Sequence, residues 1–149
     1  MEVTNMKKMF FVLTIVLFAV VEIMVGSAET GNVSCTKYLC ASAVLESGAG
    51  IVEGGVHVDA SWKVRYEIRN MTLSWLDAKG KLISFEADPE LPLTLTLGAG
   101  EGRSDYYQFN IVRDSRAENL RIDVKIYDTL ANDWLTVSLT RPVALFIEP

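Results

Sequence analysis

Few side chains in this sequence could carry out chemistry. The 149 residues include one histidine, His57, and two cysteines, Cys35 and Cys40. One imidazole and two thiols do not complete the ligand set of a usual zinc enzyme, and no Gly-x-Ser-x-Gly turn exposes a nucleophile that His57 could activate. Loop carboxylates such as Asp88 and Glu101 could serve as acid and base, but nothing marks them as buried. We therefore expect no catalytic residues, no metal and no cofactor.

The two cysteines are expected to form a disulfide with each other. Cys35 and Cys40 are the only pair available, and cysteines in an exported chain usually oxidise. Closing so short a loop stabilises the fold by roughly 2 kcal/mol on the chain-entropy formula, so the bridge fixes a local loop. The alternative is a reactive thiol pair, but four residues separate these cysteines where redox motifs have two.

Residues 1–28 read as a secretory signal peptide. Lys7 and Lys8 precede the uncharged run Met9–Val21, and a Gly-Ser-Ala stretch then offers a cleavage site. The alternative is an uncleaved anchor over Met9–Val25, which is short against the ~20 residues that span a bilayer. Either reading places the rest of the chain outside the cytoplasm, secreted or at the cell surface, with membrane contact only through an uncleaved anchor.

Charge argues against nucleic acid as a partner. The net charge is −5, and the chain has no lysine-rich or arginine-rich stretch to neutralise phosphates. A protein partner outside the cell, or self-association, is the better expectation.

Strict alternation of apolar and polar residues dominates the chain after residue 55. Every even position from Val56 to Ile68 is apolar, which predicts one long strand with one face on a core. The phase reverses at Asn70, so a bulge or bend is expected there. Asp77–Gly80 then predicts a hairpin turn. The aromatic residues in phase with this core are Trp62, Tyr66, Trp75, Tyr107 and Phe109.

Further short alternating segments complete an all-β pattern. They include Leu93–Leu97 and Leu120–Ile126, separated by turns rich in glycine, proline and asparagine. About seven strands at roughly 8–12-residue spacing predict an antiparallel two-sheet sandwich over residues 56–149. Residues 29–55, with glycines at positions 48, 50, 54 and 55, are expected to be a flexible N-terminal segment carrying the disulfide.

The order of strand ends and turn residues in these segments resembles that of immunoglobulin-like and fibronectin type III-like extracellular modules. Val64–Asn70 is an alternating strand ending in Asn, Asp77–Gly80 is an Asp-x-x-Gly hairpin, Leu95–Glu101 closes in a Gly-Glu turn, and Leu120–Asp128 ends in Asp. The resemblance covers roughly residues 56–139 and concerns architecture. It implies an immunoglobulin-like sandwich, although the antibody pattern of two cysteines around a tryptophan is absent.

Several residues are candidates for contacts or modification. Asn32 and Asn70 each begin an Asn-x-Ser/Thr glycosylation pattern. Tyr106 and Tyr127 lie out of phase with the apolar residues of their strands and should point outward. The uninterrupted apolar run 143–147 needs cover from another strand, so its members are the remaining candidates for a partner surface: Val143, Leu145 and Ile147.

These observations favour an exported binding or scaffold module that acts through protein–protein contacts. The alternative is a self-assembling filament or coat subunit in which residues 143–147 complete a neighbour's sheet by strand addition. A hydrolase or inhibitor whose active loop carries no sequence signature is the third hypothesis.

Overall fold

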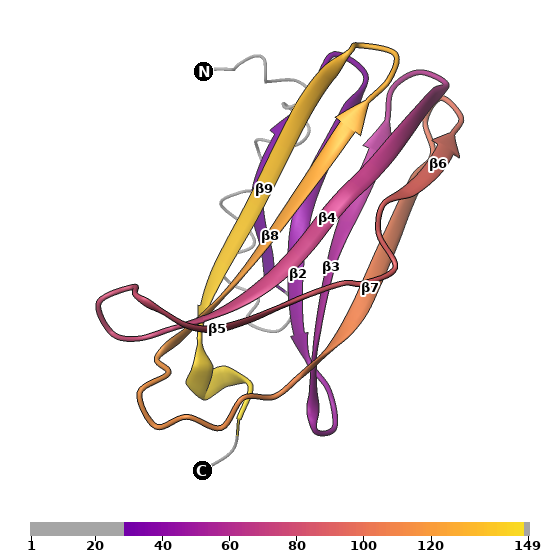
Figure 1. Cartoon of the computed structure of the whole chain (residues 1–149). Helices are drawn as coiled ribbons and strands as arrows, with labels where there is room; N and C mark the ends of the chain where they lie inside the picture. The colour runs from indigo at the N-terminus through magenta and orange to yellow at the C-terminus, as the bar shows by residue number, and fades with distance from the viewer. Residues whose placement is uncertain (1–28, 148–149) are drawn as a thin grey trace.

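The chain folds into two antiparallel β-sheets packed face to face, as predicted. The computed structural model describes residues 29–147. One sheet has the order β1-β2-β3-β7, and the other has the order β5-β4-β8-β9 with β6 also paired to β4 (Figure 1). This arrangement is consistent with an immunoglobulin-like architecture. The strands are β1 Glu29–Cys35, β2 Leu39–Ser47, β3 Ile51–Ala60, β4 Val64–Leu76, β5 Leu82–Ala87, β6 Leu93–Leu97, β7 Gly102–Asn110, β8 Asn119–Asp128 and β9 Asp133–Pro142.

The core fills the space between the two sheets. Successive side chains of a strand point to opposite faces, so the strands that line the core direct alternate residues into it. In β8 the buried set is Leu120, Ile122, Val124 and Ile126. The largest fully buried side chains are Trp75, Tyr66 and Phe109.

The long alternation from Val56 to Ile68 is two strands, which corrects the prediction of one. β3 ends at Ala60 in the four-stranded sheet, and β4 begins at Val64 in the five-stranded sheet. The chain crosses between the sheets through three residues. Even-numbered residues face the core in both β3 and β4, so the alternation continues across the crossover and does not reveal it. Trp62 lies in this crossover and is 62% exposed, so its prediction as a core residue was wrong.

The change of phase at Asn70 is a β-bulge, as predicted. The register of β4 against β8 shifts between Ile68 and Asn70, which leaves Arg69 as the extra residue. The hairpin between β4 and β5 is also present, and Gly80 has a φ of +82° that favours glycine.

Residues 29–55 belong to the sandwich, which corrects their description as a flexible segment. β2 pairs with β3 along its whole length and buries Leu39, Ala41, Ala43 and Leu45. Gly54 and Gly55 lie inside β3, where neighbours approach closely. A Cβ at Gly54 would lie 2.5 Å from Ile122 Cδ1, and one at Gly55 would lie 2.5 Å from the Asp105 carbonyl oxygen. These two glycines therefore serve packing and not mobility.

The apolar run after β9 packs partly against its own domain. Val143–Leu145 form a short 3₁₀ helix and not a strand. The Val143 amide donates to the Glu118 carbonyl at 2.9 Å, and Val143, Phe146 and Ile147 pack against the core. Leu145 remains exposed.

Candidate binding surface at the disulfide end

The disulfide closes the hairpin between β1 and β2. Cys35 and Cys40 are bonded to each other, which confirms the predicted pairing, and they are direct partners in the antiparallel register. Inside the closed loop, the Thr36 amide donates to the Leu39 carbonyl at 2.8 Å. We call this end of the sandwich, where β1 meets β2, the disulfide end. Residue 29, where the described chain begins, pairs with Leu45 far from it.

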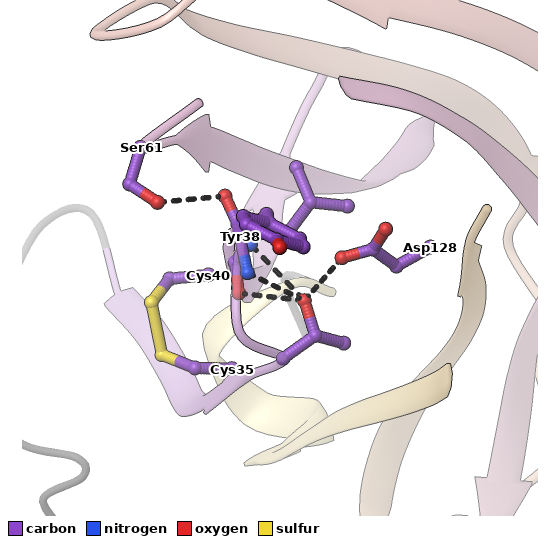
Figure 2. Close-up of a disulfide and its surroundings, with 7 residues drawn as sticks. Cys35, Tyr38, Cys40, Ser61 and Asp128 are labelled. Carbon is purple, nitrogen blue, oxygen red and sulfur yellow. Dashed lines mark hydrogen bonds between the residues drawn. A yellow bond between two sulfur atoms is a disulfide. The ribbon is translucent and has the colours of Figure 1, made fainter. Parts of the chain in front are cut away.

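A buried carboxylate ties the disulfide loop to the turn between β8 and β9. The Thr36 hydroxyl accepts hydrogen bonds from the Leu39 and Tyr38 amides at 3.0 and 3.3 Å. It donates to Asp128 Oδ2 at 2.5 Å (Figure 2). Asp128 is completely buried, and its Oδ1 accepts from the amides of Leu130 and Ala131, each at 2.9 Å. One carboxylate therefore holds two turns that are distant in sequence.

The crossover between β3 and β4 is fixed to the same loop. The Ser61 amide donates to the Tyr38 carbonyl at 2.9 Å, and the Ser61 hydroxyl does so at 3.3 Å (Figure 2). The Thr129 hydroxyl, from the turn between β8 and β9, donates to the Arg65 carbonyl at 2.5 Å. Three turns thus share one hydrogen-bonded network.

The turn between β6 and β7 joins this network on its other side. The Gly100 amide donates to the Ala60 carbonyl at 2.8 Å, and the Ala60 amide donates to the Glu101 carbonyl at 2.9 Å. Glu101 also folds back, because its Oε1 accepts from the Gly98 amide at 2.6 Å. In Figure 1 these turns gather at the upper end of the sandwich.

This rigid end presents apolar side chains to solvent. Trp62 and Leu130 are 62% and 48% exposed. Lys63 follows Trp62 in the crossover and is exposed, and so is Lys37 in the disulfide loop, whose ammonium lies 5.5 Å from the centre of the Tyr38 ring. An exposed tryptophan on a backbone that is held in place is typical of a protein-binding surface. Sequence reasoning missed this surface, because its members come from turns far apart in the chain.

The residues expected to contact a partner do not share one surface. Tyr106 is 48% exposed on the outer face of the four-stranded sheet. Tyr127 lies half-buried on the outer face of the five-stranded sheet, with its ring 4.7 Å from that of Trp134. Val143 and Leu145 lie beyond the end of β9 that is farthest from the disulfide end, as does Ile147.

The two candidate glycosylation sites are both exposed and lie apart. Asn32 lies in the edge strand β1, and Asn70 lies at the bulge of the central strand β4. Asn70 pairs with Lys125 on the outer face of the five-stranded sheet.

His57 does lie between a serine and an aspartate. Its Nδ1 is 2.7 Å from Ser104 Oγ and its Nε2 is 3.1 Å from Asp59 Oδ1. The row lies on an open sheet face, with the side chains of His57 and Asp59 40% and 61% exposed. Water competes for each of these hydrogen bonds, and the row itself forms no enclosed site where a developing oxyanion would be stabilised. The arrangement can cross-link β3 to β7, but it lacks the surroundings that make such a trio reactive.

Among the ionisable groups with shifted pKa values, Tyr66 and Asp114 have the largest shifts, each with a local cause. Burial raises the pKa of Tyr66 to about 12, with the Asp105 charge adding to the rise. Within residues 29–147 the Tyr66 hydroxyl has no hydrogen-bond partner. In the loop before β8, hydrogen bonds from Arg116 hold the pKa of Asp114 at about 2. Tyr66 is the cross-strand partner of Asp128 and so lies next to the network at the disulfide end, whereas Asp114 lies in the loop before β8, at the opposite end of that strand.

A hollow of about 430 Å³ opens at the opposite end of the sandwich. It lies between the turn that joins β2 to β3, Ile111, Arg113 and the segment 144–147. Arg113 is the charged residue among its described lining residues, and none of these offers a carboxylate or imidazole for proton transfer. Among residues 29–147, no three His, Cys, Asp or Glu side chains are grouped so that they could hold a metal ion.

In comparisons with known proteins, no family model matches this chain, and neither does any curated sequence. Over the part of the chain that the structure describes, no helix has the length and apolar character needed to span a bilayer.

Proposed function

We propose that this chain is a non-catalytic binding module that acts outside the cytoplasm and holds a protein partner at the disulfide end. The observation that carries the proposal is the exposed Trp62 side chain, set in a group of turns that a disulfide and a buried carboxylate hold together.

Rigidity at the disulfide end favours binding. A surface that is already ordered loses little conformational entropy when a partner docks, so more of the contact energy appears as affinity. Covering the exposed part of Trp62 would remove on the order of 120 Å² from water, which stabilises a complex by about 3 kcal/mol. That is the scale of a single dominant interface residue.

The disulfide supports a location in an oxidising compartment. Structural disulfides persist in secreted and cell-surface proteins and are rare in the cytosol. The expected signal peptide over residues 1–28 supports the same location, and it lies outside the described residues.

Strand order supports kinship with immunoglobulin-like and fibronectin type III-like modules. β2-β3-β7 faces β5-β4-β8-β9, and the connecting turns gather at the two ends of the sandwich. Sandwiches of this kind commonly bind through the turns at one end. This support is an analogy of fold, and the binding role rests on the disulfide end itself.

The alternatives have less support. Strand addition by residues 143–147 would require the 3₁₀ helix to unwind and Val143 to leave its contact with Glu118. A hydrolase would require the exposed row at His57 to act without an enclosed site.

Crosslinking on intact producing cells tests the proposal. The wild-type chain should capture a protein partner, and Trp62→Ser and Leu130→Ser should each reduce the capture at least about tenfold. Phe85→Ser is the matched control, because Phe85 is also 62% exposed but lies in β5, outside the disulfide end. Equal loss in all three variants, or no loss in any, would overturn the proposal.

A further inference from the structure

The outer faces of the two sheets differ in charge. On the four-stranded sheet, core residues such as Val56 and Val58 place the odd positions of β3 outward. β2, β3 and β7 therefore direct three carboxylates outward and no lysine or arginine: Glu46, Glu53 and Asp59. We call this surface the acidic face.

The acidic face contains an unfavourable pair. Glu46 and Glu53 are direct cross-strand partners, and like charges in that position destabilise a sheet. Within the described part of the chain, no ion pair reaches either carboxylate, and Glu53 accepts only a 3.5 Å hydrogen bond from Gln108. Beside them, the Tyr106 ring lies across Gly55 and forms a flat aromatic surface. A cation from another molecule would relieve the repulsion.

The outer face of the five-stranded sheet is basic. Its carboxylates Glu67 and Asp123 are already paired, with Arg69 at 2.6 Å and Arg121 at 2.9 Å. Two further cations on this face, Arg65 and Lys125, make no ion pair with a carboxylate in the described residues. We call this surface the basic face.

An exposed tryptophan gathers the cations of the basic face. Trp134 is 43% exposed, and the Lys125 ammonium lies 4.6 Å from the centre of its ring. The Arg69 guanidinium lies 5.3 Å from the same centre. Lys125 and Arg69, the latter also paired with Glu67, are thus held against one aromatic ring on a protein whose net charge is −5.

We propose that the basic face of one copy docks on the acidic face of a second copy. Lys125 and Arg69 would meet Glu46 and Glu53, and Trp134 would meet Tyr106. The two faces are on opposite sides of the sandwich, so the contact is heterologous and leaves one free face of each kind. Copies therefore add in a row, face to back.

The expected contact is modest in size. Four strands about 4.8 Å apart and about 30 Å long present about 600 Å² per copy, or about 1,200 Å² in total. That is at the lower limit of stable interfaces, so the association should be weak for free chains and sensitive to salt. It involves none of the exposed residues of the disulfide end, so partner capture and stacking can fail independently.

Charge reversal tests this pairing in the purified full chain. Arg69→Glu/Lys125→Glu gives both faces a net negative charge, and Glu46→Lys/Glu53→Lys gives both faces a net positive charge. By sedimentation velocity at low ionic strength, the wild type should associate, and each variant alone should have a dissociation constant raised at least about tenfold. An equimolar mixture of the two variants should associate again.

Controls separate this result from misfolding and from non-specific charge effects. Lys79→Glu/Lys81→Glu changes the charge by the same amount at the hairpin between β4 and β5, and should associate like the wild type. Near 1 M salt, where the screening length is about 3 Å, association should disappear. A wild type that stays monomeric at low salt, or a mixture that does not associate, would overturn the proposal. If the protein stays monomeric and binds dextran sulfate through Lys125, the basic face binds an anionic polymer and not a second copy. That result would also overturn the proposal.

Discussion

Removing the Thr36 hydroxyl should measurably loosen the disulfide end. Thr36→Val keeps the shape of the side chain but deprives Asp128 Oδ2 of its 2.5 Å donor. A hydrogen bond to a charged group contributes about 1.5–3 kcal/mol, and the carboxylate that loses it is completely buried. We therefore expect a loss of about 2 kcal/mol in the free energy of unfolding, measured by urea denaturation at neutral pH.

A double-mutant cycle isolates the contact between these two side chains. Asp128→Asn should cost about 2–3 kcal/mol, because an amide NH₂ would then face either the Thr36 hydroxyl or the Leu130 and Ala131 amides. Together, the two changes should cost about 1 kcal/mol less than the sum of the single changes. Thr136→Val, at an exposed position of β9, is the matched control and should change stability by less than about 0.5 kcal/mol. Additive losses, or equal stability of the two valine variants, would refute the role of the Thr36–Asp128 hydrogen bond.

Four further outcomes follow from the structure. Tyr66→Phe should stabilise the fold by about 1 kcal/mol, because it removes a buried hydroxyl without a partner in residues 29–147. Because burial raises the pKa of Tyr66 from 10.0 to about 12, the unfolded chain releases the phenol proton at lower pH than the folded chain does, and the wild type loses stability as the pH rises from 10 towards 12. The phenylalanine variant lacks this loss, so its unfolding free energy should fall less in alkaline urea titrations, and parallel curves would contradict this. Gly55→Ala should lower the unfolding free energy by about 1–3 kcal/mol through its clash with β7, and an unchanged midpoint would show that the strand can shift. Replacing Cys35 and Cys40 by serine should cost about 2 kcal/mol and weaken partner capture, whereas intact capture would mean that the network holds without the bridge. His57→Ala should leave activity on a broad panel of hydrolase substrates unchanged, and loss of a measurable activity would revive the hydrolase hypothesis.

Alternation predicted the sandwich because burial on one side of a strand leaves a direct trace in the sequence. It failed at the crossover between β3 and β4, which contains Trp62. The three-residue link leaves even-numbered residues facing the core in both strands, so the alternation continues through a segment that belongs to neither strand. It also missed β1 and the length of β2, whose inward residues include Ala41 and Ala43. Small side chains give a weak apolar signal, and the glycines of β3 resemble a linker until their neighbours are seen.

The disulfide end was only partly predictable. Pairing of Cys35 with Cys40 followed from the count of cysteines. Asp128 carried a usable signal, since a carboxylate occupies a position in phase with the buried residues of β8. The meeting of Trp62 with turns from elsewhere in the chain depends on sheet order, which local pattern does not contain. The same holds for Ser104, which reaches His57 only through the pairing of β3 with β7.

Strand β4 pairs with three other strands. It pairs with β8 along one edge, while its other edge is divided between β6 at the start and β5 at the end. Because β5 and β6 are each anchored to β4 separately, the link 88–92 between them is not needed to keep either in place. A protease cut or a foreign peptide at Pro89–Glu90 would leave both ladders intact, which makes this link a natural place to attach a reporter while leaving the disulfide end untouched.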